Sequence, residues 1–504
     1  MAIQDEKRQV IIVGGGITGL TMALMLQNLG VDYVLLEAYG TVTPNVGASI
    51  GLFPNGLRIL DQLGCYDDIL ARGQPVEEHI VRNSITGKRI MTRKSRSLIT
   101  KRHGYPNIFM ERFELLNVLY EHLKDKSRIF VNQKVKRVES LKDSALVYTR
   151  DGSVFEGQMV VGADGVRSTI RQEMWRNADD NNDSSAIPAR DRQNIPCEHA
   201  CIFGTAKPTA GVGPGQVVGA SGHGTVAGCM GGPSGEVFVF WFWTLPEGQR
   251  SYPIDEIPRF TEEDKKREFG RSVDTLVADN GLRFREVLKN LEYSGVTALP
   301  HFVMRRWHYG RIVILGDAAH KFNPLVGQGG NSCIESCASL VNALQEQNII
   351  GKGVSAAASW KLSSLETAFV TVEEQRVERL AFMVEQCQEA MRMSAWDTWK
   401  GRLVQQYVAP LLPLARWLNF YSDQIVGGLS LKGVKPPSSG HEWLYSDEKT
   451  VEEKAMTLSR ASVIATIPVA AVTAFMVARI LRQENGAGGS VLLSRVMEKI
   501  SSFR

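Results

Sequence analysis

The chain has 504 residues, of which 43% are hydrophobic and 22% charged, as in ordinary globular proteins with two or three domains. Its net charge of +4 is small and no long basic block is present, so we expect no nucleic-acid partner. The nearest approach to a metal cluster is Cys197 and Cys201 with His199 between them. No second pair stands at zinc spacing, so we expect no metal site and reduced, mostly buried thiols.

The two ends of the chain differ in character. Asp5 to Arg8 lead directly into an apolar strand, a pattern that predicts no secretory signal. Residues 461–478 carry no charge, and as a helix they would span about 27 Å, marginally enough for a bilayer core. We therefore predict a transmembrane helix over 461–481, a single-pass anchor in an endoplasmic-reticulum-type membrane with the preceding chain in the cytosol. A buried or interfacial helix is the alternative.

The hydrophobic pattern predicts a βαβ unit at the start of the chain, with a strand over 9–13, a helix over 17–29 and a strand over 33–37. The next predicted elements are a helix over 111–124 and strands over 128–149 and 155–164. Residues 177–194 are dense in Asp, Asn, Ser and Arg, and we expect a mobile surface insertion there.

The second half of the chain alternates between predicted strands and predicted helices. Residues 200–243 are Gly-rich and strand-like, and the almost wholly apolar segment Val237 to Trp243 suits a strand buried on both faces. The remaining predicted elements are a helix over 265–290, a strand over 311–315, a helix over 331–345 and a mostly helical region over 356–420.

A glycine motif stands between the first predicted strand and the first predicted helix. In Gly14-x-Gly16-x-x-Gly19, Gly14 permits the tight turn, Gly16 lets the backbone approach a pyrophosphate, and Gly19 lets the helix pack on the strand. The helix start then offers backbone amides and its dipole to the phosphates. Glu37 ends the second strand, where a carboxylate can accept both ribose hydroxyls of an adenosine. The motif predicts a bound adenine dinucleotide.

Two further motifs also follow predicted strands. Residues 162–168 contain Asp164, which is either a ligand or a plain turn residue when taken alone. Asp317 precedes small residues and is placed to bind a ribityl or ribose hydroxyl. Residues 327–330 would let the backbone approach a flat ring, and Asn331 is predicted to cap the following helix. His320 is expected to be a structural histidine. Together with the first motif, this third one indicates one FAD held by both halves of the chain.

These three segments resemble those of the single-component FAD-dependent monooxygenases, the group that includes the aromatic-ring hydroxylases. The resemblance covers roughly residues 8–345. Within the group, three shorter segments resemble the fungal epoxidases of meroterpenoid and indole-diterpene pathways, namely Gly47 to Gly51, Pro54 to Gly56 and Glu111 to Leu116. By position, the resemblance implies FAD contacts from Glu37, Gly51, Arg112, Asp317 and Gly330, beside Gly14, Gly16, Gly19 and Asp164.

The resemblance implies an α/β fold with a glutathione-reductase-type FAD-binding domain over 8–175 and 300–350. A β-sheet substrate domain over 76–105 and 195–299 would be interleaved with it, followed by a helical C-terminal region over 356–445. The implied reaction is NAD(P)H- and O2-dependent epoxidation of an alkene in the prenyl chain of a lipophilic substrate. The alternatives are aromatic-ring hydroxylation and, from another class, a non-catalytic prenyl-binding module.

One departure concerns the catalytic residue. Some relatives are assigned a catalytic tyrosine in the substrate domain, but this chain has no tyrosine between Tyr148 and Tyr252. Residues 219–226 occupy the corresponding region, and His223 is the titratable residue among them. We therefore predict no catalytic acid or base, because the cofactor carries the reactive oxygen while the protein supplies placement and dryness. Trp241 to Pro246 also resembles a signature of flavin-dependent halogenases, a less favoured alternative because the segment Gly327 to Asn331 is intact.

Overall fold

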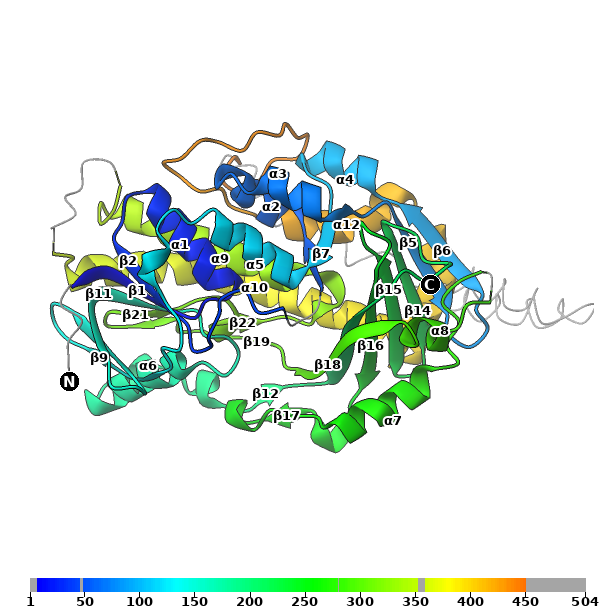
Figure 1. Cartoon of the computed structure of the whole chain (residues 1–504), viewed down its shortest axis with the longest axis horizontal. Helices are drawn as coiled ribbons and strands as arrows, with labels where there is room; N and C mark the ends of the chain where they lie inside the picture. Colours follow the sequence, from blue (N-terminus) through cyan, green and yellow to red (C-terminus); the bar gives the residue numbers. More distant parts are fainter. Residues whose placement is uncertain (1–6, 46–48, 280, 352–358, 450–504) are drawn as a thin grey trace, which may run out of the picture.

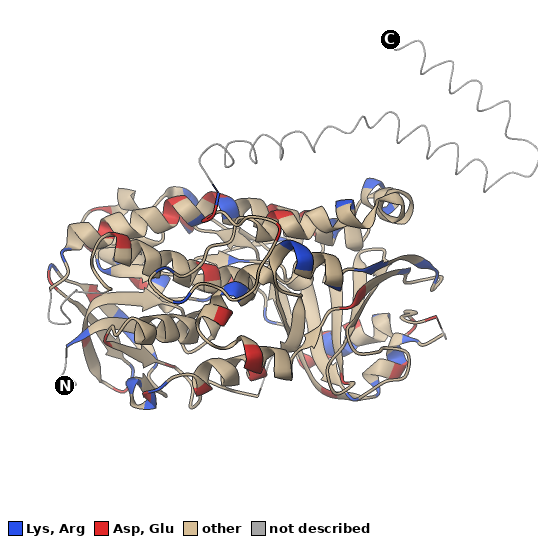
Figure 2. Cartoon of the chain, turned by 90° about the horizontal axis from the view of Figure 1, so that it is seen from above, with Lys and Arg blue, Asp and Glu red and all other residues tan. Residues whose placement is uncertain are grey.

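The computed structural model describes residues 7–45, 49–279, 281–351 and 359–449. Two large sheets lie side by side, an eight-stranded one at the left of Figure 1 and a seven-stranded one at the right. Basic and acidic residues are interspersed over both halves (Figure 2).

The eight-stranded sheet begins with the predicted βαβ unit. Strand β1 (Arg8–Val13) pairs in parallel with β2 (Tyr33–Leu36), and α1 (Ile17–Asn28) connects them. Both strands are almost wholly buried, which explains their continuous apolar runs. The strand order is β20-β21-β11-β1-β2-β8, with β10 and β9 attached beside β11. The other strands are β8 (Ile129–Phe130), β9 (Val135–Ser140), β10 (Ala145–Thr149), β11 (Val154–Gly162), β20 (His308–Tyr309) and β21 (Ile312–Ile314).

Helices from distant parts of the sequence pack against this sheet and against each other. α1 contacts both α5 (Arg112–Glu121) and α9 (Gln328–Glu346), and α9 also packs on α2 (Pro54–Gln62). α6 (Thr169–Asp180) packs on β9, β20 and β21. The neighbouring short elements are β3 (Ser49–Leu52), α3 (Tyr66–Arg72), β4 (Gln74–Pro75), α4 (Arg96–His103), β7 (Ile108–Glu111), η1 (Lys126–Arg128), β19 (Phe302–Val303), η6 (Gly316–Ala318), β22 (His320–Lys321) and η7 (Pro324–Val326).

The seven-stranded sheet combines two separate stretches of the chain, and its order is β18-β13-β16-β15-β14-β5-β6. Neighbouring strands are antiparallel except for β14 and β5. Residues Val237 to Trp243 of β16 are buried, so the prediction of a strand covered on both faces is confirmed. The strands are β5 (Glu78–Asn83), β6 (Arg89–Lys94), β13 (His199–Ala206), β14 (Gln216–Gly222), β15 (Thr225–Gly231), β16 (Val237–Thr244) and β18 (Leu291–Leu299).

The described chain from residue 362 to Ile425 is mostly helical, as the pattern over 356–420 predicted, whereas the last part of the helical region expected over 356–445 forms no helix between residues 426 and 445. The 33-residue helix α10 (Leu362–Ser394) packs on α9 and on η7. It is followed by α11 (Trp399–Leu403), the π-helical turn η8 (Val404–Val408), η9 (Ala409–Leu411) and α12 (Leu414–Ile425).

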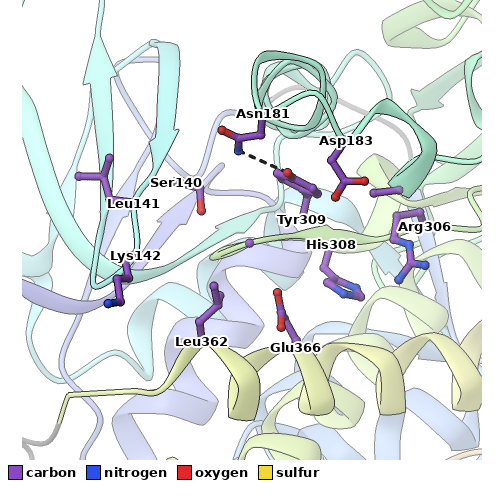
Figure 3. A pocket seen from close by; sticks show the side chains of 12 residues that line it. Ser140, Leu141, Lys142, Asn181, Asp183, Arg306, His308, Tyr309, Leu362 and Glu366 are labelled. Atoms are coloured by element: carbon purple, nitrogen blue, oxygen red, sulfur yellow. Dashed lines mark hydrogen bonds between the residues drawn. The ribbon is translucent and has the colours of Figure 1, made fainter.

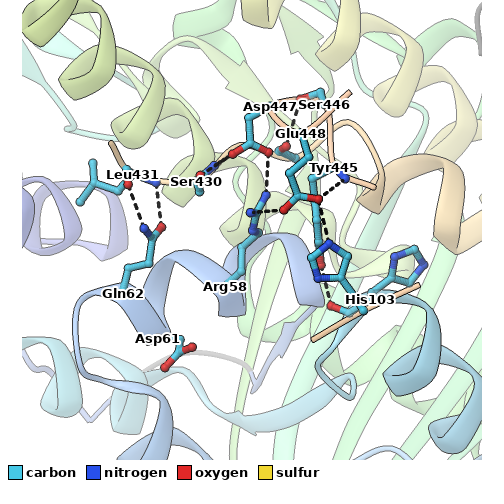
Figure 4. A network of polar contacts seen from close by, with 12 residues as sticks. Arg58, Asp61, Gln62, His103, Ser430, Leu431, Tyr445, Ser446, Asp447 and Glu448 are labelled. Atoms are coloured by element: carbon cyan, nitrogen blue, oxygen red, sulfur yellow. Dashed lines mark hydrogen bonds and ion pairs between the residues drawn. The ribbon is translucent and has the colours of Figure 1, made fainter. Parts of the chain in front are cut away.

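Residues 427–449, here called the C-terminal strap, return over α2 (Figure 4). Arg58 of α2 is buried and pairs with Asp447 at 2.9 Å and Glu448 at 3.1 Å, while its guanidinium lies 3.9 Å from the centre of the Tyr445 ring. Gln62 exchanges two hydrogen bonds with the backbone of Leu431. These contacts fix the strap to the helix whose other end approaches α9.

Two predictions of local structure are wrong. Residues 177–194 do not form an irregular insertion, because α6 continues to Asp180 and two short helical turns follow, η2 (Ser184–Ala186) and η3 (Ala189–Arg192). Buried Asp191 accepts hydrogen bonds from the backbone amides of Arg305 and Arg306. The predicted helix over 265–290 is instead two helices, α7 (Glu262–Ser272) and α8 (Phe284–Leu288). The remaining short elements are β12 (Ile195–Pro196), η4 (Glu247–Gln249), β17 (Ser251–Tyr252) and η5 (Ile254–Glu256).

Among the helices of the described ranges, none has both the length and the apolar character needed to cross a membrane. The predicted anchor over 461–481 lies outside those ranges.

Candidate active site

Four parallel strands end at predicted site residues. β1 is parallel to β2 and to β11, and β11 is parallel to β21, so the carboxyl ends of all four meet at one edge of the sheet. Gly14 follows β1, Glu37 follows β2, Asp164 follows β11 and Asp317 follows β21. This edge is where open α/β sheets bind their ligands.

The glycine motif has the geometry that its sequence predicts. Gly14 has φ +107°, a conformation that other residues rarely adopt, and its amide donates to Leu36 O at 2.8 Å. A Cβ at Gly19 would lie 1.9 Å from Gly14 O, so only glycine permits this contact between α1 and the turn. Beside Gly16, which precedes α1, a Cβ would meet only Arg112, at 3.8 Å. The backbone here is open to a ligand.

Glu37 is tied to the same turn. Its Oε2 accepts a hydrogen bond from the Gly15 amide at 2.6 Å, and its Oε1 accepts one from the Tyr39 amide at 2.9 Å. The residue is 9% exposed. A buried carboxylate next to the phosphate-binding turn is suited to accept hydrogen bonds from the hydroxyl groups of a ribose.

Arg112 opens α5 and is half-buried, yet it makes no hydrogen bond or ion pair within the described chain. Burial lowers the pKa of its guanidinium, an effect that the charges of Asp317 and Glu37 oppose. A cation removed from water without a partner is costly. Since this cation lies beside Gly16, a pyrophosphate is the partner that suits it, and the residues present therefore fit a dinucleotide.

Asp317 lies in η6, and its carboxylate is 31% exposed. It pairs with Lys321 at 2.5 Å, a partner that the sequence did not indicate because Lys321 belongs to no motif. The Cys333 thiol of α9 lies 4.0 Å from the other oxygen of Asp317. The carboxylate retains an accessible side toward the nucleotide-binding edge.

Asn331 does not cap α9, and that prediction is wrong. Helix α9 begins at Gln328, because Gly327 adopts φ +71° and serves as the N-cap itself. Fully buried Asn331 instead donates from Nδ2 to Gly51 O at 3.0 Å and to Gly327 O at 2.8 Å, and its Oδ1 accepts from the Phe53 amide at 2.9 Å. The side chain joins β3 to the third motif.

The glycines around Asn331 are closely surrounded. A Cβ at Gly330 would lie 2.6 Å from the Ile50 side chain, and one at Gly51 would lie 3.0 Å from Phe109. At Gly327 it would lie 2.6 Å from Phe53. Gly327 and Gly330 thus let the start of α9 approach Phe53 and Ile50, whereas Gly51 leaves room for the Phe109 ring of β7.

Asp164 has a structural task. Its carboxylate accepts hydrogen bonds from Ser168 Oγ at 2.5 Å and from the Ile170 amide at 3.0 Å, which caps α6. Fully buried Arg171 of α6 donates to Ala318 O and Val166 O, each at 2.7 Å, so it joins the second motif to the third. Sequence reasoning missed Arg171, because a buried arginine gives no periodic signal. A contact of Asp164 with FAD stays a prediction.

His320 lies in the core, where its Nε2 is 3.0 Å from Ser336 Oγ and its ring packs on Trp307. Burial, reinforced by the Arg376 charge, lowers its pKa to about 3, which suits a structural residue. His199 pairs with Asp397 at 3.0 Å. No group of three His, Cys, Asp or Glu side chains in the described part of the chain is arranged to hold a metal ion.

A surface cleft of about 420 Å³ lies at the amino end of β21, between the β9–β10 turn, α6 and the start of α10 (Figure 3). Its walls include Lys142, Arg306 and Glu366, and Asn181 Nδ2 donates to Tyr309 Oη at 3.3 Å. None of the predicted FAD ligands lines it. This cleft is therefore separate from the candidate site.

Residues 7–190 and 249–356 match the family model described as FAD binding domain. The chain is 34% identical to the FAD-dependent monooxygenase nvfK of Aspergillus novofumigatus over 88% of this chain and 92% of that protein. It is also 34% identical to the FAD-dependent monooxygenase ausM of Penicillium brasilianum over 81% and 83% of the two chains. The chain belongs to this family of FAD-dependent monooxygenases.

A solved structure supports the fold of this monooxygenase. HpxO of Klebsiella pneumoniae, in complex with FAD and uric acid, superposes with a TM-score of 0.68 at 20% identity, covering 84% of this chain and 97% of that one. The matched FAD binding domain supports FAD as the cofactor, as the sequence predicted, while its contacts with the individual motif residues stay a prediction.

We expect Arg112→Met to weaken FAD binding about tenfold to a hundredfold, because one charge-assisted interaction of about 1.5–3 kcal/mol is lost. Flavin titration of the apoprotein, followed by fluorescence, measures the change. Exposed Arg137→Met is the control and should leave the affinity unchanged. Equal affinity of the Arg112 variant and the parent would remove Arg112 from the set of FAD ligands.

Proposed function

We propose that this monooxygenase uses NAD(P)H and O2 to epoxidise an alkene in the prenyl chain of a lipophilic meroterpenoid or indole-diterpene intermediate of fungal secondary metabolism. One oxygen atom enters the alkene and the other leaves as water, with two electrons supplied by NAD(P)H. Reduced FAD supplies the activation of O2. The observation that carries the proposal is the apolar sheet face next to the third motif.

That face comes from alternate residues of β16. Phe238, Phe240 and Phe242 form one apolar cluster, against which Phe109 and Leu325 pack. Leu325 lies in η7, directly before Gly327, so the cluster adjoins the loop expected at the flavin ring. An apolar chain gains about 25 cal/mol per Å² of buried surface there, and exclusion of water favours oxygen transfer.

The roles of the chain's own residues follow from their positions. The turn at Gly14 to Gly19, with Arg112, would hold the pyrophosphate. Glu37 would accept hydrogen bonds from the adenosine ribose, and Asp317 one from a hydroxyl of the ribityl chain. Gly51 and Gly330 would allow backbone contact with the flavin. No residue is assigned as an acid or base, because an alkene attacks an electrophilic oxygen without losing a proton.

The alternative is hydroxylation of an aromatic ring at the same site. The neutral imidazole of His79, on the sheet face that carries Phe238, gives this alternative its support, because a phenol needs an acceptor for its proton. Halogenation is less favoured. Trp241 packs on Phe284 and Trp243 on Phe260, so both lie on the sheet face opposite Phe240.

We expect the purified enzyme to oxidise NADPH when a farnesyl- or geranylgeranyl-phenol is added, and to place a single oxygen on the prenyl chain. The reaction is run under 18O2 and analysed by mass spectrometry with fragmentation. Label on the chain supports epoxidation. Label on the ring alone would establish hydroxylation instead, and a chlorinated product would establish halogenation.

We also propose that residues 461–481 anchor the enzyme as a single-pass helix with its large N-terminal part in the cytosol, where flavin and NADPH are supplied. A membrane would concentrate a lipophilic substrate beside the enzyme.

Deletion from residue 461 onward should move the protein from the membrane pellet to the soluble fraction, because the uncharged run is lost. Deletion from residue 483 onward keeps the run and should leave the protein in the pellet. Fractionation and immunoblotting measure both. A full-length chain that is soluble without detergent would refute the anchor.

A further inference from the structure

His79 of β5 has polar atoms without a partner. Neither ring nitrogen forms a hydrogen bond with any described residue, and Nε2 has no contact with solvent. An unmade hydrogen bond at a buried polar atom costs about 1–3 kcal/mol. Such a group is explained by local strain, by a catalytic role, or by a partner from outside the chain such as a water molecule or a ligand.

Two aromatic rings of α12 pack against this imidazole. The ring of Trp417 lies edge-on at 5.2 Å between centroids, and that of Tyr421 lies at 5.9 Å. Tyr421 in turn stacks on Phe53 at 6.0 Å. The Tyr421 hydroxyl likewise makes no hydrogen bond within the described residues. Two polar groups without partners thus lie in one aromatic setting.

Arg93 holds α12 in place over His79. It is the register partner of His79 on β6, and its Nη2 donates to the carbonyls of Ala409, Pro410 and Leu412 at 2.9–3.1 Å. These residues precede α12. The three carbonyls thus occupy Nη2 of Arg93, whereas its Nε is buried without a partner.

There is open space beside His79 on the same sheet face. His79 and Val81 share this face, and Val81 is the register partner of Gly219, which in turn pairs with Gly228. A Cβ at Gly219 would meet no atom within 4 Å. The strand order therefore places an unfilled stretch of sheet diagonally next to the imidazole.

The same sheet face continues from Gly219 toward the loop expected at the flavin, although a Cβ at Gly228 would already lie 3.3 Å from Phe240. Gly228 is the register partner of Phe240, which belongs to the apolar cluster with Phe109 and Leu325. On the other side, Phe53 contacts the position of Gly327. A molecule held at His79 can therefore extend over Gly219 to the loop that begins α9.

We propose that His79 and Tyr421 bind the ring headgroup of the substrate, an uncharged ring bearing a hydroxyl or carbonyl, so that its chain lies over Gly219. This inference rests on the proposed function, whose substrate it specifies. Burial lowers the pKa of His79 to about 4, so the imidazole is neutral at physiological pH and offers one donor and one acceptor.

The test compares two probes on the flavin-loaded enzyme, farnesylhydroquinone and farnesylbenzene, which lacks the hydroxyls. Binding is followed by the change in the flavin absorbance spectrum. We expect the parent to bind farnesylhydroquinone about tenfold more tightly, as one hydrogen bond predicts. His79→Phe keeps a ring against Trp417 and removes both nitrogens, so it should bind the two probes equally.

Thr92→Val is the matched control. Thr92 Oγ1 is also buried without a partner, but Thr92 pairs with Ile80 and so lies on the opposite sheet face. This variant should keep the tenfold preference. Gly219→Leu fills the open space next to His79 and should weaken the binding of both probes by the same factor. Melting temperature and flavin content of every variant should match the parent, since no existing hydrogen bond is removed.

A parent enzyme that does not distinguish the probes, or a His79→Phe variant that keeps the preference, would overturn the headgroup site. The outcome is separate from that of the proposed reaction. If His79→Phe loses the preference for farnesylhydroquinone but the parent places no oxygen on the farnesyl chain, the headgroup site is supported and epoxidation is refuted. If the parent places oxygen on the chain but His79→Phe keeps the preference, epoxidation is supported and the headgroup site is refuted.

Discussion

The side chain of Asn331 holds the flavin end of this enzyme together. Two donors and one acceptor of its amide are satisfied by backbone groups of Gly51, Phe53 and Gly327, with no solvent contact. The segments that it joins are 280 residues apart in the sequence. Each bond left unmade in this buried setting costs about 1–3 kcal/mol, so no other side chain of similar size can take its place.

The rest of the site is arranged around this amide. One helical turn further along α9, buried Glu335 pairs with Arg376 and accepts from Asn55 at 2.6 Å. Burial would raise the pKa of Glu335, but Arg379 and Arg376 outweigh it and hold the carboxyl ionised. α2, α9 and α10 are thereby locked together, and the C-terminal strap adds a second attachment to α2 through Arg58. The arrangement of these helices is consequently set by long-range contacts rather than by local sequence.

Local patterns sufficed for much of the fold. The strand and helix around Gly14, the buried strand β16 and the helix after Gly327 follow from continuous apolar runs and from glycines that other residues cannot replace. The prediction of a mobile surface insertion over residues 177–194 is wrong because it takes all of their polar side chains to face solvent. Asn177 and Asp191 instead bind backbone groups of neighbouring strands and loops.

The residues of the candidate site and of the proposed headgroup site that sequence patterns did not indicate share one property. Lys321, Arg171, His79 and Tyr421 belong to no repeating pattern, and their roles arise from partners, or from missing partners, that only the assembled fold reveals. Arg112 was assigned by resemblance, yet the physical reason for it, an unpaired cation beside Gly16, became evident only from the packing.

Asn331→Asp tests the central claim most directly. A carboxylate cannot donate to Gly51 O and Gly327 O, so the variant should remain folded but bind FAD at least about tenfold more weakly. Asn177→Asp is the matched control, because buried Asn177 makes similar backbone hydrogen bonds far from the FAD motifs. Its FAD affinity should equal that of the parent. An Asn331→Asp protein that binds FAD as tightly as the parent would contradict the account.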